Sequence, residues 1–436
     1  MSTFRTETRF AWALDLSFTT DPLAQQIVNS SQEELLEKRK IWAVRGIDTY
    51  DTSSPLARYV ADGRATYWLS NSESSMETVV FEPYHWIHVK YPWDATVVYL
   101  TRKSHAELLQ LYHADEDDDL AFYPYLTNRI EGANVFTNKV NFVTTLASYF
   151  LEGRAGRSAS YIQTPSYVIH SAADCEAFLQ NQWIIDNRTW VHKLAAESQG
   201  IGIAFFSPLQ PSRLPCSPTD GSREPFVLQA HIDYPLLFSG KKSEMRAYWA
   251  IVSVDPLIVV LYNRGTVRLA TKNYTGWNNW ENPLVHVLNT RQQKDANPNY
   301  EQTAEERKRS WTALPQKLRR EGRIPQSQSD EEWIDRVLLP VINETIYTVV
   351  RAAQGDLQSK EHNPLGMENR RFELFGLDII LEDTTARLAD KGTNNLGEGG
   401  SVIEPGGLRA WVTEAQVGPG LSLDSKTKLE VSTAMT

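Results

Sequence analysis

Hydrophobic and polar positions alternate most clearly between Phe226 and Tyr274, where the pattern predicts strands around a charged cluster. β-Branched and aromatic residues dominate three short runs, which are Phe226–Gln229, Tyr248–Val252 and Ile258–Tyr262. The charged residues between and after these runs are Lys241, Lys242, Glu244, Arg246, Arg264 and Arg268. Charges spaced among strand-forming residues predict one sheet, with one face in the core and the other face holding a polyanion.

A long helix and two further strands are predicted toward the C-terminus. Apolar residues recur at helical spacing over Trp333–Ala353, which indicates a buried helix. The apolar run Phe372–Leu381 predicts a buried strand that carries Asp378, and a later strand is predicted at Arg409–Gln416. If these two strands pair, Asp378 lies beside Glu414 and Gln416. The Gly-rich and Asn-rich stretch Lys391–Gly407 between them predicts irregular structure.

Helix and strand patterns alternate in the region before this sheet. A helix is expected over Phe136–Phe150, a strand over Ser166–His170 and a helix over Ala172–Gln180. This alternation is typical of a nucleotide-binding lobe. It makes Lys139 a candidate phosphate contact, although a surface lysine at the start of a helix is the commoner explanation.

A strand that ends in Lys193 precedes a loop of small residues with Gly200 and Gly202, and a second strand follows. A hairpin of this kind can cover a triphosphate with its backbone N–H groups. A single Gly-x-Gly is a weak signal, and the sequence contains no Gly-x4-Gly-Lys-Ser/Thr motif. The later polar stretch Asn289–Thr303 is expected to be a flexible lid.

Composition and charge exclude several classes of protein. The 436 residues are 41% hydrophobic, which is enough for two or three lobes around a shared site. A formal net charge of −10 argues against a nucleic-acid partner. Two cysteines are too few for a disulfide framework, and no apolar run is long enough for a signal peptide or a membrane span. We therefore expect a cytoplasmic globular protein.

Taken in order, these motifs resemble the tubulin–tyrosine ligase family of the ATP-grasp superfamily, from about Ala95 to the C-terminus. The motifs are Lys193 with Gly200-Ile-Gly202-Ile203, Gln229-Ala-His-Ile232, Lys242-Ser-Glu-Met-Arg246, Asp255-Pro-Leu257, Tyr262-Asn-Arg-Gly265 with Val267-Arg268, His286-Val-Leu-Asn289, Phe375-Gly-Leu-Asp378 and Glu414-Ala-Gln416. Each motif alone is weak, and their order and spacing make the resemblance specific.

The resemblance implies an α+β chain with an ATP-grasp fold, in which the nucleotide lies between two mixed or antiparallel sheets. The implied divisions are an N-terminal lobe at residues 1–94, the first part of the ligase domain at 95–186, a central lobe with a phosphate-covering loop at 187–228, and a C-terminal lobe at 229–436 with an insertion at 385–408. The role of residues 1–94 stays open between substrate recognition and a structural extension.

The resemblance also implies a chemistry, ATP-dependent formation of an amide bond through an acyl phosphate. It assigns the transferred phosphoryl group and the activated carboxylate to Arg246 and Arg268, and the neighbourhood of the acceptor to Asn289. The residues implied to contact ATP are Lys139, Lys193, Gln229, His231, Ile232, Lys242 and Glu244. Those implied to bind Mg²⁺ are Asp378, Glu414 and Gln416. Such a site needs charge neutralisation more than a protein nucleophile.

Three positions depart from the family pattern. Ala230 stands where a lysine is usual, Glu244 where an aspartate is usual, and Gln416 where an asparagine is usual. Asp390 competes with Glu414 for the second metal position, because it lies near the ordinary hairpin distance from Asp378.

The substrates stay open at this point. The implied partners are an amino-acid amine and a carboxylate acceptor, which is a small molecule, a peptide or an acidic protein tail. Tubulin is one candidate acceptor, although the acidic charge of this chain and the run Asp115–Asp119 weigh against it. Ala230 and Gln416 motivate an alternative, a catalytically weak or inactive binding protein on the same scaffold.

Overall fold

The computed structural model separates the chain into two compact units, which are described one at a time. Unit 1 comprises Met1–Arg129, Arg370–Phe372 and Ser432–Thr436, and unit 2 comprises Ile130–Asn369 and Glu373–Val431. The residues that the structure describes are 66–69, 81, 86–89, 95, 97–99, 126–151, 162–180, 189–197, 200–206, 224–254, 256–276, 282–300, 307–360, 371–391, 401–403 and 406–419. The acidic run Asp115–Asp119 lies outside them.

Unit 1 contains a small parallel sheet. Its strand order is β2-β1-β3-β4. The strands are β1 (Thr66–Leu69), β2 (Ile87–His88), β3 (Val97–Tyr99) and β4 (Leu126–Thr127). The buried rings of Tyr67 and Phe81 stack with their centroids 4.0 Å apart. This stacking and the burial of Val98 give unit 1 its own apolar contacts.

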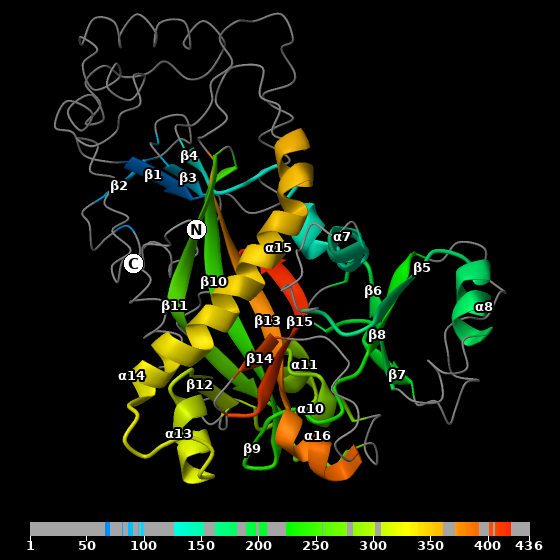
Figure 1. The fold of residues 1–436 in the computed structure, drawn as a ribbon. Coiled ribbons are helices and arrows are strands. Elements are labelled where there is room, and N and C mark those ends of the chain that lie inside the picture. The colour runs from blue at the N-terminus through cyan, green and yellow to red at the C-terminus, as the bar shows by residue number, and fades with distance from the viewer. Residues whose placement is uncertain are drawn as a thin grey trace, which may run out of the picture. The chain divides into compact units, whose positions relative to one another are not determined.

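Unit 2 is built on a large antiparallel sheet (Figure 1). Its order is β12-β11-β10-β13-β15-β14, with β9 also paired to β10. The strands are β9 (Leu237–Phe238), β10 (Lys241–Val254), β11 (Leu257–Leu269), β12 (Lys308–Ser310), β13 (Glu373–Asp383), β14 (Ser401–Ile403) and β15 (Leu408–Val417). The residues of the charged cluster lie within β10 and β11, because β10 begins at Lys241, where polar and apolar residues already alternate.

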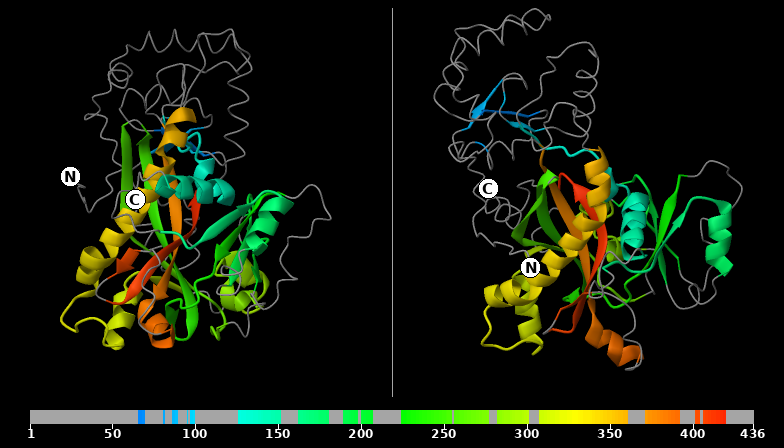
Figure 2. Two further views of the ribbon diagram at one scale, coloured as in Figure 1. Left: turned by 45° about the vertical axis from the view of Figure 1, so that its right-hand side comes forward. Right: turned by 45° about the horizontal axis from the view of Figure 1, so that its top comes forward.

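One face of this sheet is covered by the long helix α15 (Leu339–Lys360), as Figures 1 and 2 show. Alternate residues of β10, such as Met245 and Trp249, are buried in the same core as Ile342 and Ile346 of α15. α14 (Asp330–Trp333) and a π-helix (Ile334–Leu338) precede α15. The predicted helix is therefore confirmed, although it begins with a π-helical segment and extends to Lys360.

A second antiparallel sheet in unit 2 has the order β5-β8-β6-β7. Its strands are β5 (Ser166–Ile169), β6 (Trp190–Leu194), β7 (Ala204–Phe206) and β8 (Phe226–Ala230). The prediction that Phe226–Gln229 shares one sheet with the next two runs is therefore wrong. β8 is buried along its whole length and pairs with β5 and β6, while β10 and β11 belong to the large sheet.

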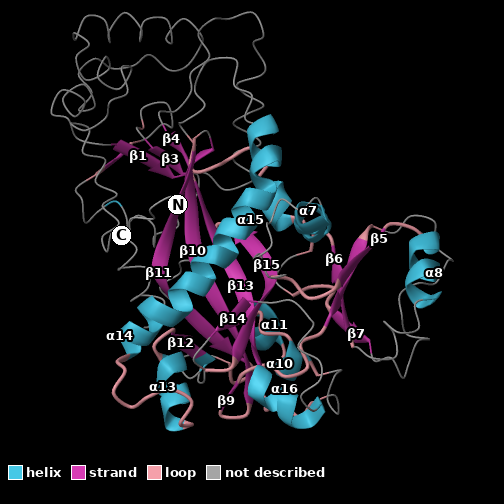
Figure 3. Ribbon diagram, viewed as in Figure 1, coloured by secondary structure: helices cyan, strands magenta, loops and turns pink. Residues whose placement is uncertain are grey.

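The remaining helices of unit 2 connect these strands. They are α6 (Asn134–Thr137), α7 (Lys139–Leu151), α8 (Ala172–Gln180), α10 (Pro283–His286), α11 (Thr290–Asp295), α13 (Ala313–Arg320) and α16 (Thr384–Lys391). Helices and several sheets together confirm the α+β class (Figure 3). Within the described residues, none of the helices combines the length and apolarity needed to cross a bilayer.

The stretch Lys391–Gly407, predicted to be irregular, contains β14, which pairs with β15. The insertion also includes α16 before this stretch, where the backbone N–H groups of Thr385 and Ala386 donate to Asp383 Oδ1. Similarly, the predicted lid contains α11, whose first turn is capped by the Asn289 side chain.

Cys175 is disulfide-bonded and buried, which the cysteine count did not predict.

Candidate functional site

A cleft of unit 2 is lined by residues from both of its sheets. The empty space in this cleft, including open solvent at its mouth, is about 730 Å³. Lys193 and Gln229 come from the small sheet, while Lys242, Arg268 and Asp378 come from the large sheet. Residues 287–289, after α10, line it as well.

Charged residues form a row across four strands of the large sheet. Glu244 of β10 lies opposite Arg268 of β11, Arg246 of β10 lies opposite Asp378 of β13, and Asp378 lies opposite Glu414 of β15. Directly opposite residues of antiparallel strands point to the same face, as do residues two apart on one strand. The register therefore confirms the predicted position of Asp378 beside Glu414. Asp390, its competitor, lies in α16.

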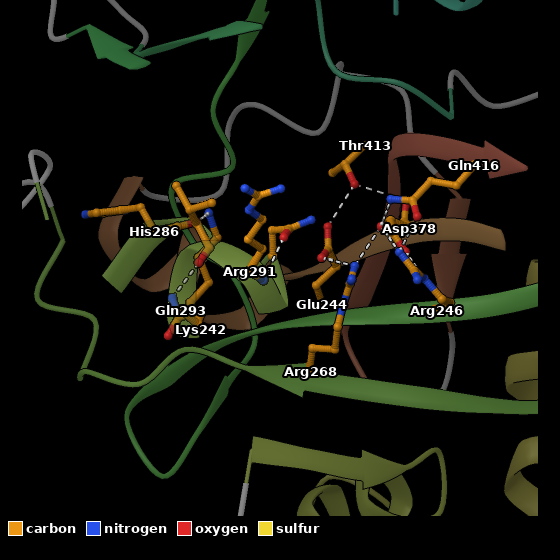
Figure 4. A network of polar contacts seen from close by, with 12 residues as sticks. Lys242, Glu244, Arg246, Arg268, His286, Arg291, Gln293, Asp378, Thr413 and Gln416 are labelled. Atoms are coloured by element: carbon orange, nitrogen blue, oxygen red, sulfur yellow. Dashed lines mark hydrogen bonds and ion pairs between the residues drawn. The ribbon is translucent and has the colours of Figure 1, made fainter. Parts of the chain in front are cut away.

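Asp378 is the centre of this row, and its carboxylate accepts four hydrogen bonds (Figure 4). Arg246 donates from Nε at 2.7 Å and from Nη2 at 2.8 Å, and Arg268 donates from Nη2 at 2.6 Å. Gln416 donates from Nε2 at 3.1 Å and accepts from Arg246 Nη2 at 2.9 Å. Burial alone would raise the pKa of Asp378, but the two arginines outweigh it and hold this pKa at about 2.

Glu244 balances the second arginine. Its Oε2 lies 2.5 Å from Arg268 Nη2, and its Oε1 accepts a hydrogen bond from Thr413 Oγ1 at 3.0 Å. Burial raises the pKa of Glu244 against the opposing charge of Arg268. The charges of two arginines and two carboxylates thus cancel here. A bound polyanion would therefore have to replace the carboxylates as the hydrogen-bond partners of the arginines.

Thr413 is a site residue that the sequence analysis missed. The register between β13 and β15 shifts after Asp378, which pairs with Glu414 while Ile379 pairs with Val412. The resulting bulge places the Thr413 hydroxyl within hydrogen-bond reach of Glu244 and of the Asp378 carbonyl. The adjacent polar pair Thr413-Glu414, which breaks the alternation of β15, is the sequence signal for this bulge.

Two lysines lie beside Glu414. Lys193 Nζ donates to Gln229 Oε1 at 2.6 Å and to the Thr413 carbonyl at 3.0 Å. Lys139 Nζ lies 3.8 Å from Glu414 Oε1, and the Lys139 side chain is only 11% exposed. Lys139 is therefore partly buried next to the row, which differs from the surface lysine that was the commoner explanation of its position.

The opposite end of the cleft is apolar and aromatic. Its lining includes Phe205, Ile232, Val287 and Ile380. The Phe205 ring centroid lies 5.2 Å from that of His286. A cleft with one apolar end and one charged end matches a ligand that carries a flat heterocycle at one end and an anionic group at the other.

His231 and Lys242 lie next to this apolar end. His231 Nδ1 is 3.2 Å from Asp233 Oδ1, and its Nε2 is 3.2 Å from Lys242 Nζ. Burial, reinforced by Lys242 and Lys193, lowers the pKa of His231 well below its ordinary value. The imidazole is therefore neutral, donates from Nδ1 to Asp233 and accepts at Nε2 from Lys242.

The glycine loop after β6 reaches the segment that follows α10. Gly200 has a φ of +78°, in the left-handed region that favours glycine. A Cβ at Gly200 would lie 2.7 Å from Gln292 Cγ and 3.2 Å from Asn289 Cβ. Asn289 lines the cleft and caps α11 by accepting from the backbone N–H of Arg291. Its proximity to an acceptor stays a prediction.

The residue types of the row fit magnesium carried by a nucleotide. No group of three His, Cys, Asp or Glu side chains suited to a metal occurs among the described residues. Asp378 and Glu414 nevertheless supply neighbouring carboxylates, and Gln416 supplies an amide oxygen. Because Mg²⁺ is usually bound by one or two carboxylates together with substrate phosphates, this donor set suffices.

The ammonium of Lys193 gives the site a testable pH dependence. Burial lowers the pKa of Lys193 to about 8, against the attraction of Glu414, whereas the ordinary value is 10.5. Between these values the unfolded chain holds a proton that the folded protein has lost, so the contribution of Lys193 to stability rises with pH. A neutral amine attracts phosphate less, so we expect nucleotide affinity to fall as the pH rises through about 8.

The dissociation constant of a nucleotide, measured at several pH values, checks this expectation. Lys193→Arg is the matched variant, because arginine stays charged throughout and should make the profile less steep. The slope that remains is expected from Lys242, which also lines the cleft and whose pKa burial lowers to about 8. A profile that is equally steep in both proteins would contradict the role of Lys193.

Part of this chain is similar to a known protein family and to several known proteins. Residues 146–388 match the family described as the tubulin-tyrosine ligase family. The chain is 23% identical over 263 residues to human tubulin polyglutamylase TTLL5, covering 58% of this chain and 17% of that protein. It is 26% identical over 289 residues to human tubulin monoglutamylase TTLL4, covering 65% and 20%.

A third relative is shorter. The chain is 23% identical over 257 residues to a probable alpha-tubulin polyglutamylase, Ttll1, of Tetrahymena thermophila, covering 57% of this chain and 52% of that protein. The matched part of the chain thus spans a sixth to a half of the length of these relatives. The family match over residues 146–388 includes the cleft residues from Lys193 to Asp378, whereas Glu414 lies beyond it.

Proposed function

The chain belongs to the tubulin-tyrosine ligase family, and on this premise we propose that it is an ATP-dependent ligase that joins an amino-acid amine to a carboxylate. The observation that carries the proposal is the row of Arg268, Glu244, Arg246, Asp378 and Glu414 at the charged end of a cleft whose other end is apolar. We place the nucleotide between the two sheets of unit 2, which is the ATP-grasp arrangement.

The base belongs at the apolar end in this proposal and the phosphates at the charged end. Val287 and Ile380 line the apolar end, and Lys193 and Lys242 present ammonium groups from the two sheets. Asp378 and Glu414 would hold Mg²⁺, which would neutralise part of the phosphate charge. No protein nucleophile is required, because the acceptor carboxylate itself attacks the γ-phosphate.

The two arginines do most of the electrostatic work in the proposed reaction. As the acceptor carboxylate oxygen bonds to the γ-phosphorus and ADP leaves, negative charge spreads over the phosphoryl oxygens. Asp378 holds Arg246 and Arg268 in this row before the substrate arrives, and both guanidinium groups would exchange carboxylate partners for the phosphoryl oxygens. The amine then attacks the acyl carbon, loses a proton and releases inorganic phosphate, which leaves an amide.

The names of the relatives narrow the substrates. Human TTLL5 and TTLL4 are named as a tubulin polyglutamylase and a tubulin monoglutamylase. We therefore propose glutamate as the amine and an acidic protein tail of the tubulin type as the acceptor. Lys193, Lys242 and Arg268 supply positive charge in the cleft of this acidic chain.

The test is a phosphate-release assay on the purified full chain with ATP and Mg²⁺. We expect phosphate release only when glutamate and a tubulin-tail peptide are both present, and a matching mass increase of the peptide. Glu414→Gln should reduce the rate about 100-fold or more if Glu414 holds the metal. Tight binding of the peptide with no nucleotide consumption would instead support the non-catalytic binding protein.

A further inference from the structure

Gln293 of α11 is a buried glutamine whose side-chain amide makes four hydrogen bonds. Its Oε1 accepts from the backbone N–H of Thr271 at 2.9 Å and from Thr271 Oγ1 at 2.5 Å. Its Nε2 donates to the carbonyl oxygens of Pro283 at 3.1 Å and Val287 at 2.5 Å. Only 1% of the residue is exposed, so each polar atom of this amide is used inside the protein.

These bonds join the segment after β11 to the wall of the cleft after α10. Thr271 lies two residues beyond the end of β11, and the preceding residue, Ala270, donates its backbone N–H to the Lys242 carbonyl at 2.9 Å. Pro283 is the first residue of α10 and Val287 follows its last, and residues 287–289 line the cleft. The backbone adds one further link, from Lys272 N to the Leu284 carbonyl at 3.0 Å. Gln293 therefore connects the segment that follows β11 to the wall after α10.

Other residues near the apolar end also contact the wall that Gln293 holds and the His286 that precedes it. Lys242 Nζ lies 3.4 Å from the His286 carbonyl, and the Tyr274 ring centroid is 5.6 Å from that of His286. Gly200 approaches the same segment at Val287 and Asn289. A shift of this wall would therefore change the space for a base while leaving the cross-strand row of charges in place.

We propose that Gln293 is a positioning residue for the base end of the cleft, where it sets the distance between the wall of residues 287–289 and β11. The proposal rests on the nucleotide orientation of the proposed function. It predicts that Gln293 contributes to the affinity for the base of a nucleotide and not to the affinity for its phosphates. A residue that served only the stability of the fold would not discriminate between these two parts of the ligand.

The test compares ATP with inorganic tripolyphosphate, which lacks the base, as ligands of the full chain in titration calorimetry with Mg²⁺. Gln293→Glu keeps the shape of the side chain and places an oxygen opposite the carbonyl oxygens of Pro283 and Val287. We expect the Kd for ATP to rise about tenfold or more, because two buried acceptors lose their donor. The Kd for tripolyphosphate should change less than about twofold, within the error of such a comparison.

Gln316→Glu is the matched control, because it makes the same chemical change in α13 and Gln316 does not line the cleft. It should leave both dissociation constants unchanged. Thr271→Val removes one of the four bonds and repeats the test if Gln293→Glu does not fold, with an expected rise in the ATP Kd of about threefold.

The outcomes separate the two proposals. A wild-type protein that binds tripolyphosphate but gains nothing from the base contradicts both the proposed nucleotide orientation and the role of Gln293. If the wild type prefers ATP and the variants retain that preference unchanged, only the role of Gln293 is overturned. An equal loss of affinity for ATP and tripolyphosphate also overturns it, because that result indicates a general structural role.

Discussion

Replacing Asp378 by alanine is expected to lower the free energy of unfolding by about 3–5 kcal/mol, the cost of breaking a buried ion pair by removing one partner. The Asp378 side chain is 3% exposed, and it accepts from both Arg246 and Arg268. Without it, Arg246 keeps only Gln416 as a partner in this row, and Arg268 keeps only Glu244. Chemical denaturation followed by fluorescence measures the change.

Asp335→Ala is the control for this prediction. Asp335 also pairs with an arginine, Arg264, but at 3.4 Å and with 54% of its side chain exposed. Exposed pairs contribute about 0–1 kcal/mol, so this variant should be close to the wild type in stability. Equal stability losses for Asp378→Ala and Asp335→Ala would contradict the role of Asp378 as the centre of a buried charge network.

Replacing Gly265 by alanine is expected to destabilise the protein by about 3 kcal/mol, near the upper end for overpacking a core. A Cβ at Gly265 would overlap the backbone carbonyl oxygen of Arg246 and would lie 2.5 Å from Trp311 Cε2. Trp311 is fully buried, so neither neighbour can move without disturbing the core. Because the clash is with the backbone of Arg246, nucleotide affinity should fall as well.

Gly355→Ala provides the matched control in α15. Gly355 is in a helix, and apart from the neighbouring backbone of that helix no atom of the described residues lies within 4 Å of a Cβ built there. Alanine there should stabilise the protein by about 0.5–1 kcal/mol. Thermal unfolding of both variants checks the pair, and a Gly265→Ala protein as stable as the wild type would contradict the close packing between β10 and β11.

The proximity of Asp378, Glu414 and Gln416 could be predicted from the sequence, because it requires only that their two strands pair, whereas the exact register also depends on the bulge at Thr413. Asp378 lies on an apolar strand, and Glu414 and Gln416 are two residues apart on the next, so pairing these strands brings all three together. The long helix before this pair could be predicted for a similar reason, since its apolar residues keep a helical period over several turns.

Other features depend on contacts that the pattern does not contain. β8 carries the same strand-forming residue types as β10, and its place in the small sheet follows from pairing with β5 and β6, which precede it in the chain. The Thr413 bulge requires the relative register of β13 and β15. β14 was missed because the glycines of Lys391–Gly407 disfavour regular structure, and its place depends on pairing with β15.

The ion pairs of the row are a further feature that the sequence pattern did not predict. The residue types predicted that two arginines bind an anion and that nearby acidic residues bind a metal, as separate roles. In the structure the same groups bind one another, since Asp378 accepts from both arginines and Glu244 accepts from Arg268. Registers that place opposite charges on facing residues favour such pairing whenever no ligand intervenes. Substrate binding in the proposed reaction would therefore exchange partners within this row.

The most direct test of the proposed ligase follows an oxygen atom. The acceptor peptide is prepared with heavy oxygen in its carboxylates and incubated with the full chain, ATP, Mg²⁺ and glutamate. Attack of the carboxylate on the γ-phosphate, followed by amide formation, transfers one labelled oxygen to each phosphate released. We predict labelled phosphate in proportion to the amide product. Unlabelled phosphate, or phosphate that remains on the peptide, would contradict ligation through an acyl phosphate.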